Sequence, residues 1–317
     1  MKYFFALFAL LAALSCAATA QAVQSSCDDV MQRGHLNVLT INILYTDFFS
    51  RMERLQAVAD FIAAQEQAGE PVDIILLQEV VSGAVAGTVS LSINLHAMLR
   101  RRGLDYNLRF RPVAGLPAVF MVGNALLSRC AITGFASRLL PYAPERPIAD
   151  IGLPVLHEVQ QIAIDVPDYG SASVYNTHLC AYCPGEDRLR QTKSLFRFLD
   201  RREDNESRLI VLGGDFNTDV TVAADMPAYT LITDDNGFTD TYATANACTD
   251  CCSDAEGLDG CTYAVPGNTL VSGAPPVRID YVFVQGDFSS LKSRVVFNEA
   301  PWVSDHSGVL TRIGLQP

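Results

Sequence analysis

The sequence predicts an α/β fold in which a β-sandwich carries helices on its outer faces. Short apolar runs rich in branched side chains outnumber amphipathic helical segments by roughly two to one, and the helices are interspersed among the strands. Acid, amide and imidazole side chains follow directly after several of these runs. Because a rigid sheet aims the side chains at its strand ends, we expect these polar groups to share one cleft.

The first elements along the chain are a strand, a helix and a second strand. Residues 36–43 are branched and apolar and follow a glycine, which predicts a buried strand. Apolar residues recur at helical spacing over 51–68, which predicts an amphipathic helix that ends at the next Gly and Pro. Residues 73–77 predict a second core strand, with Glu79 just past its end.

The middle of the chain contains a helix, four strands and a long loop. The helix is expected over 91–102, and a Pro-rich stretch over 141–154 predicts the loop. The four strands are expected over 105–110, 119–128, 159–166 and 172–178.

The last part begins with a helix over 187–201, followed by a strand over 209–212 that leads into GGDFN. The segment 234–276 is rich in Asp, Thr, Gly and Cys, so we expect an irregular region held by disulfides. Strands return over 279–285 and 309–313.

The N-terminus has the pattern of a secretory signal peptide. Lys2 precedes an apolar run over 3–14, and small residues follow up to Ala20. The run is shorter than the roughly 20 residues that a membrane span requires. Lipoprotein processing at Cys16 is the alternative. The expected parts of the chain are a signal peptide over 1–20, an N-terminal extension over 21–34 and one domain over 35–317.

Export implies an oxidising compartment, secreted or periplasmic, in which cysteines are usually paired. The chain has nine cysteines, and eight remain once Cys16 leaves with the signal peptide. An even number suits disulfides, although the spacing of two Cys-x-x-Cys pairs also fits zinc half-sites. The eight cysteines are Cys27, Cys130, Cys180, Cys183, Cys248, Cys251, Cys252 and Cys261.

The formal net charge is −12, which gives no long-range attraction for polyanions. A local basic patch would be needed for nonspecific binding of nucleic acid. The arginines between Arg100 and Arg111 could form such a patch, but a solvated helix end and strand face is the simpler interpretation.

Six short segments place polar groups beside predicted core strands. Each segment alone is more often a turn or a helix cap than a site. The segments are Asn42, LLQE ending at Glu79, NTHL over 176–179, GGDFN over 213–217, RIDYVF over 278–283 and SDH over 304–306.

Together and in this order, the segments resemble the superfamily that includes deoxyribonuclease I, the apurinic endonucleases, neutral sphingomyelinases and inositol polyphosphate phosphatases. The resemblance covers residues 35–314, and GNALLSR over 123–129 is similar to the family's strand before the phosphate-binding side. The resemblance implies a two-sheet sandwich flanked by helices, the four-layer sandwich of deoxyribonuclease I, with the site at one edge. It also implies that 35–317 is a catalytic domain.

The resemblance implies a divalent metal site. Glu79 matches the family's metal carboxylate, assisted by Asn42 and Asp305. Hard oxygen ligands suit Mg²⁺, with Mn²⁺ or Ca²⁺ as alternatives.

The resemblance also implies the groups that act on the phosphate. His306 falls where the family has an imidazole that activates water or contacts phosphate, and Asp280 would orient its ring. Asp215 and Asn217 would position water and phosphate, and Asn217 can donate a hydrogen bond. His178 would contact phosphate or protonate the leaving oxygen.

Structural interpretations compete with several of these roles. His178 could be a core histidine, and Asp280 could form a buried ion pair with Arg278. Arg188 and Gln191 are interpreted as residues that pack the helix and anchor a loop. Three histidines match no motif and are interpreted as structural: His35, His96 and His157.

The expected substrate is a phosphodiester, in nucleic acid or in a phospholipid headgroup. A secreted nuclease is the first hypothesis, and a sphingomyelinase-like phospholipase C is the alternative. Only about twenty residues separate RIDYVF from Asp305, which leaves no room for a large membrane-inserting hairpin. We therefore expect no stable membrane insertion. We also expect a monomer. A noncatalytic binding module is the third hypothesis, although none of the motif residues is missing.

Overall fold

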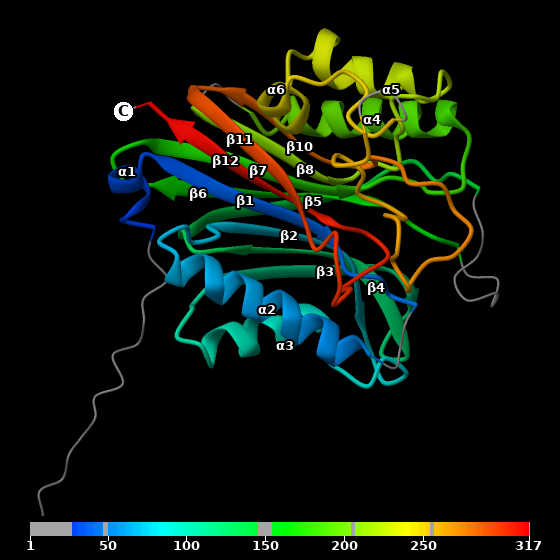
Figure 1. Cartoon of the computed structure of the whole chain (residues 1–317), viewed down its shortest axis with the longest axis horizontal. Helices are drawn as coiled ribbons and strands as arrows, with labels where there is room; N and C mark the ends of the chain where they lie inside the picture. The colour runs from blue at the N-terminus through cyan, green and yellow to red at the C-terminus, as the bar shows by residue number, and fades with distance from the viewer. Residues whose placement is uncertain (1–26, 47–49, 145–153, 204–206, 254–256, 317) are drawn as a thin grey trace, which may run out of the picture.

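The computed structural model describes residues 27–46, 50–144, 154–203, 207–253 and 257–316. The expected signal peptide lies outside the described residues. Two six-stranded sheets pack face to face, and helices cover both outer faces (Figure 1). The predicted α/β sandwich with outer helices is therefore confirmed.

The first sheet has the strand order β11-β12-β1-β2-β4-β3. Its strands are β1 (His35–Asn42), β2 (Ile74–Ser82), β3 (Asn107–Leu116), β4 (Phe120–Ser128), β11 (Phe288–Val296) and β12 (Gly308–Leu315). β1 and β2 are parallel and are joined by helix α2 (Arg51–Gln67), while the other neighbours are antiparallel.

The second sheet has the strand order β5-β6-β7-β8-β10-β9. Its strands are β5 (Ile132–Leu139), β6 (Glu158–Val166), β7 (Gly170–His178), β8 (Leu209–Asp215), β9 (Thr239–Asp240) and β10 (Asp280–Gly286). β7 and β8 are its parallel pair, joined by helix α4 (Gly185–Leu199). Each sheet therefore contains one β-α-β unit, whose two strands finish at the same edge.

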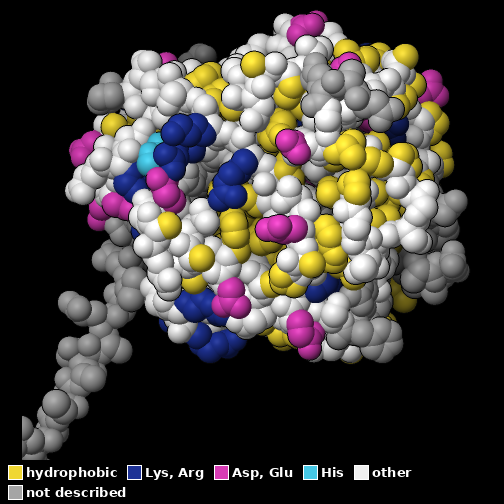
Figure 2. All heavy atoms as spheres, in the orientation of Figure 1, with side chains coloured by type: hydrophobic (Ala, Val, Ile, Leu, Met, Phe, Trp, Pro, Cys, Tyr) yellow, Lys and Arg dark blue, Asp and Glu magenta, His cyan; other side chains and the backbone are white. Residues whose placement is uncertain are grey.

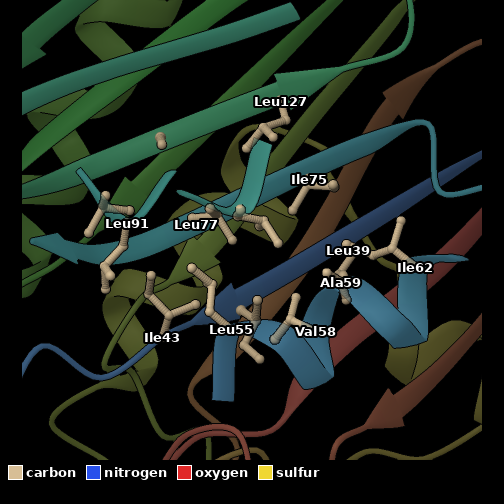
Figure 3. Packing of buried hydrophobic residues seen from close by; sticks show 14 of the residues in the cluster. Leu39, Ile43, Leu55, Val58, Ala59, Ile62, Ile75, Leu77, Leu91 and Leu127 are labelled. Atoms are coloured by element: carbon tan, nitrogen blue, oxygen red, sulfur yellow. The ribbon is translucent and has the colours of Figure 1, made fainter. Parts of the chain in front are cut away.

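α2 and α3 (Leu91–Arg100) lie on the first sheet, and α4 and α5 (Met226–Thr230) lie on the second (Figure 1). α6 (Thr241–Asn246) bridges the two sheets, because Thr241 donates to the Val282 carbonyl of β10 at 2.8 Å and Asn246 donates to the Ser293 carbonyl of β11 at 3.1 Å. Figure 3 shows how α2 packs: Leu55, Val58 and Ile62 point from one helix face onto the apolar side chains of β1 and β2. A short helix α1 (Val30–Arg33) precedes β1, and a π-helix η1 (Leu231–Asp235) follows α5.

Apolar side chains of both sheets fill the space between them. Val38 and Leu76 from the first sheet pack with Val174, Val211 and Val282 from the second, and all five are at most 1% exposed. Burying such an aliphatic side chain stabilises a fold by roughly 1.5–3 kcal/mol. Since the central strands are covered on both faces, they are nearly continuous apolar runs, which is why their positions were predictable.

Three strands were not predicted: β5, β11 and the two-residue β9. β5 and β11 carry many exposed or half-buried side chains, so neither is a continuous apolar run. Both are edge strands, each paired on one side only. The segment 234–276 is also less irregular than expected, because it contains β9 and α6.

Four disulfides join the eight cysteines of the described chain: Cys27–Cys130, Cys180–Cys183, Cys248–Cys251 and Cys252–Cys261. Both Cys-x-x-Cys pairs close on themselves, which leaves no thiolate for zinc. The first disulfide ties the entry to β1 to the end of β4, and the last two lie within 234–276, as the disulfide hypothesis requires.

Candidate active site

Polar side chains from both sheets meet where the parallel strands finish. Asn42 is the last residue of β1, His178 of β7 and Asp215 of β8. Because the two β-α-β units end at the same side of the sandwich, Asn42 and His178 both lie close to Asp215, with His178 Nε2 3.4 Å from Asp215 Oδ2. Asn42 Nδ2 is 3.0 Å from Asp215 Oδ2.

Antiparallel neighbours bring in the remaining groups, because an antiparallel strand starts where its partner ends. Asp280 is the first residue of β10 and pairs in register with Asp215. His306 precedes β12, whose Val309 pairs with Thr40 of β1.

A β-bulge in β2 turns the Glu79 side chain toward Asn42. The expectation that Glu79 lies past the end of its strand is wrong, because β2 continues to Ser82. The pairing of β2 with β4 shifts register between Leu77 and Val80, and Glu79 has a positive φ of 58°. Such a bulge re-aims a side chain at the cost of local strain. The Glu79 carboxylate accepts hydrogen bonds from Asn42 Nδ2 at 3.0 Å and from the Tyr45 backbone N–H at 2.8 Å.

His306 and Asp280 form a buried pair. His306 Nδ1 lies 2.9 Å from Asp280 Oδ2, and Nε2 lies 3.8 Å from Asp215 Oδ2. Burial alone would lower the pKa of His306, but Asp280 and Asp215 raise that pKa well above its usual value. The alternative ion pair of Asp280 with Arg278 does not form, because Arg278 pairs with Asp240 at 2.8 Å.

Asp215 is at the centre of the cluster. Its carboxylate accepts hydrogen bonds from Asn42 Nδ2 and from the Asn217 backbone N–H, each at 3.0 Å, and His178 Nε2 lies 3.4 Å away. Burial, together with the negative charge of Asp280, raises the pKa of Asp215 to about 8. Asp215 is therefore placed to exchange a proton with a water or with either imidazole.

The carboxylates of Glu79 and Asp305 fit a hard divalent cation. Burial, and then the negative charge of Asp305, raise the pKa of Glu79, so the site gathers carboxylates at an electrostatic cost that a cation would offset. Asp280 Oδ1 is buried and accepts no hydrogen bond from the described residues. A second group of possible ligand atoms, all within 4.8 Å of one another, belongs to Asp215, Asp280 and His306 and does not include Glu79 or Asp305.

Asn42 is oriented as a donor. Its Oδ1 accepts the Leu44 backbone N–H at 3.1 Å, so its amide nitrogen faces Glu79 and Asp215. This arrangement favours a role in holding the two carboxylates together over a role as an oxygen ligand. The Asn217 side chain is also engaged, since its Nδ2 donates to the Leu179 carbonyl at 2.9 Å.

The structure adds His157, which no motif indicated. Its Nδ1 lies 2.8 Å from the His178 carbonyl oxygen, and the two rings meet edge to face with centroids 5.4 Å apart. Burial, and then His157 and His306, lower the pKa of His178 well below its usual value, so the His178 ring is neutral at pH 7. His157 directly precedes β6, which is antiparallel to the strand ending at His178. That pairing is the signal that could have found it.

A pocket of about 550 Å³ opens onto this cluster and is lined by Glu79, His157, His178, Asp215, Asp305 and His306. Asp280 lies behind His306 and does not line the pocket. The interpretation of Arg188 and Gln191 as loop anchors agrees with their contacts: Gln191 Oε1 accepts from the Cys180 backbone N–H at 2.9 Å, and Arg188 donates to the Cys183 carbonyl at 2.7 Å.

Comparison with known proteins identifies the relatives of this chain. The sequence profile of the endonuclease/exonuclease/phosphatase family matches residues 39–306. The fold is similar to that of a family protein from Leptotrichia buccalis C-1013-b, with a TM-score of 0.64 and 23% identity over 88% of this chain and 99% of that one. Among curated protein sequences, none matches significantly.

Two further structures share the fold. The human nocturnin catalytic domain with bound sulfate has a TM-score of 0.61 and 17% identity over 89% of this chain and 95% of that one. Truncated TDP2 from Caenorhabditis elegans has a TM-score of 0.58 and 17% identity over 88% of this chain and 98% of that one. The family profile covers most of the sandwich and its polar end, and the chain therefore belongs to the endonuclease/exonuclease/phosphatase family.

Proposed function

We propose that the protein is an exported, magnesium-dependent phosphodiesterase that cleaves nucleotide phosphodiesters by in-line attack of an activated water. The observation that carries the proposal is the buried cluster of His306, Asp280 and Asp215 next to the Glu79 carboxylate. Hydrolysis of a phosphodiester requires charge neutralisation at the phosphoryl oxygens, a proton acceptor for water and stabilisation of the leaving oxygen. This cluster offers a group for each requirement.

Glu79 and Asp305 would hold the cation, and Asn42 would keep the carboxylates in place. When bound, the cation supplies Lewis-acid activation of the phosphate. The raised pKa of His306 keeps its imidazole protonated, which favours donation to a phosphoryl oxygen over removal of a proton from water. Asp215 in its ionised form would then take the proton of the attacking water, and its raised pKa makes that carboxylate a stronger base than an ordinary one.

His178 and Asn217 complete the proposed site. The lowered pKa of His178 favours a hydrogen bond to phosphate over protonation of the leaving oxygen. Asn217 would fix Asp215 through its backbone N–H and the Leu179 loop through its side chain.

Export is proposed from the signal-peptide pattern of 1–20 and is supported by the four disulfides, which suit an oxidising compartment. Among the described residues, no helix is long and apolar enough to cross a bilayer. We propose that the protein acts as a monomer.

The test is hydrolysis by the purified mature protein with magnesium, assayed in parallel on plasmid DNA, RNA, sphingomyelin and bis-p-nitrophenyl phosphate. We expect turnover of nucleic acid and of the nitrophenyl diester, reduced by about 10²-fold or more in folded Glu79→Gln and His306→Ala variants. Glu70→Gln, which changes an ion pair with Arg312 beside the start of β1, is the matched control. Turnover of sphingomyelin alone would favour the phospholipase C, and no turnover would favour a binding module.

A further inference from the structure

The loop that follows His178 presents an aromatic ring from a fixed backbone. Cys180 and Cys183 are buried and joined by a disulfide, and Gln191 and Arg188 bind the backbone on either side of Tyr182. The Tyr182 side chain is nevertheless 67% exposed, which is high for an aromatic ring on a cross-linked loop. Most of the ring surface can therefore be covered by a ligand, and because the loop backbone is already ordered, binding there costs less conformational entropy.

Tyr182 lines the same pocket as the proposed catalytic groups, and a second aromatic residue lines it too. Tyr263 also lines the pocket, and its ring centroid is 4.9 Å from that of His306. The backbones of Tyr263 and His306 form an isolated antiparallel bridge, which fixes this ring beside the reacting groups. Burial, the charge of Asp305 and the nearby Tyr182 hydroxyl raise the pKa of Tyr263 to about 12. Val277 and Ile279 extend this apolar wall.

Cations are scarce in the pocket. Among the described residues, Arg188 is the single Lys or Arg that lines it, and Arg188 is already paired with Asp225 and with the Cys183 carbonyl. On the face shown in Figure 2, Lys and Arg gather mainly on the left, whereas β1 finishes on the right in Figure 1. A polymer held through its backbone needs several cationic phosphate contacts. A pocket of about 550 Å³ instead has the size of a site for one small ligand.

We infer that Tyr182 stacks on an unpaired base of the nucleotide whose phosphate is attacked, with Tyr263 as the inner aromatic wall. This inference rests on the proposed phosphodiesterase function and deepens it by naming how the substrate is recognised. A stacked base must leave its duplex, so single-stranded and short nucleotide diesters are the preferred substrate class. Stacking tolerates any base, which suits a pocket with few directed polar groups outside the catalytic cluster.

The experiment compares ligands that differ only in the group beyond the phosphate. Binding of AMP, ribose 5-phosphate and phosphocholine is measured by calorimetry in the presence of magnesium. Base stacking predicts that the wild type binds AMP about 5- to 100-fold more tightly than ribose 5-phosphate. Tyr182→Ala should remove most of this difference, whereas Tyr182→Phe keeps it. Tyr142→Ala is the matched control, because Tyr142 is 55% exposed and does not line this pocket.

Three outcomes would overturn the inference. Equal affinity for AMP and ribose 5-phosphate, including no binding of either, would mean that no base subsite exists. An AMP preference that survives Tyr182→Ala would place the base elsewhere. Tighter binding of phosphocholine than of AMP would assign the tyrosines to a quaternary ammonium group. Hydrolysis of bis-p-nitrophenyl phosphate, measured separately, tells failure of this inference from failure of the proposed function.

Discussion

Replacing Asp280 by Asn tests whether a carboxylate sets the charge of the proposed catalytic histidine. Asp280 Oδ2 lies 2.9 Å from His306 Nδ1, and both side chains are buried. An asparagine can still accept the hydrogen bond through its amide oxygen, so Asp280→Asn removes mainly the negative charge.

The magnitude follows from the geometry. Two unit charges about 4 Å apart interact by about 4 kcal/mol at an effective dielectric constant of about 20, so the attraction by Asp280 is large enough to decide the protonation state of His306 near neutral pH. In the wild type the raised pKa keeps His306 protonated above pH 6.5, which is the ordinary pKa of histidine. The proton is lost only as the pH rises through the raised pKa. In Asp280→Asn, which lacks this attraction, the proton should be lost at a lower pH.

The assay is the pH dependence of kcat for bis-p-nitrophenyl phosphate at saturating magnesium. We expect the alkaline limb to move to lower pH in Asp280→Asn, so that its activity is closest to wild type at acid pH and falls by about 10²- to 10⁴-fold near pH 8. NMR titration of the imidazole protons gives an independent measure of the His306 pKa. Asp240→Asn is the matched control, because Asp240 is also buried but pairs with Arg278.

If Asp280→Asn keeps the wild-type pH profile, at full or uniformly reduced activity, the charge of Asp280 does not set the protonation of His306. A uniform reduction would mean that Asp280 only orients the ring. A shift of the same size in Asp240→Asn would show that the profile reports general destabilisation.

Three further predictions concern the metal, a buried acid and the disulfides. A chelator should abolish activity and magnesium should restore it; restoration by zinc alone would contradict the oxygen-ligand site. Burial raises the pKa of Glu158 from its usual value of 4.5 to about 7. The protonated Glu158 side chain therefore contributes to stability below pH 4.5, and this contribution is lost as the pH rises through about 7. Glu158→Gln should therefore stabilise the fold at pH 8 by up to about 3 kcal/mol and not at pH 4, checked by denaturant titration; an equal effect at both would refute this. Thiol titration of the denatured, unreduced protein should find no free thiol. Reduction should lower activity before the core unfolds, because Cys248–Cys251 and Cys252–Cys261 hold the segment leading to Asp280. Full activity after complete reduction would show that these disulfides do not support the position of Asp280.

The sequence by itself determined the central strands, the main helices and the order of the polar motifs. Strands covered on both faces are apolar along most of their length, so β1, β2 and β8 can be recognised in the sequence as runs of branched residues. Motifs placed at strand ends indicated one cleft, and their order indicated the family. The pairing of His306 with Asp280 was expected from the same motifs, and the two side chains are in contact.

Only the tertiary structure decided the features that depend on neighbours distant in the chain. Edge strands β5 and β11 are covered on one side, so their sequences lack a continuous apolar run. The bulge at Glu79 arises from register against β4, and His157 joins the site through the pairing of β6 with β7. Disulfide connectivity and the contacts that fix Tyr182 likewise depend on which segments meet in space. Local sequence encodes the propensity of each segment, whereas the contacts between segments exist only once the two sheets have packed.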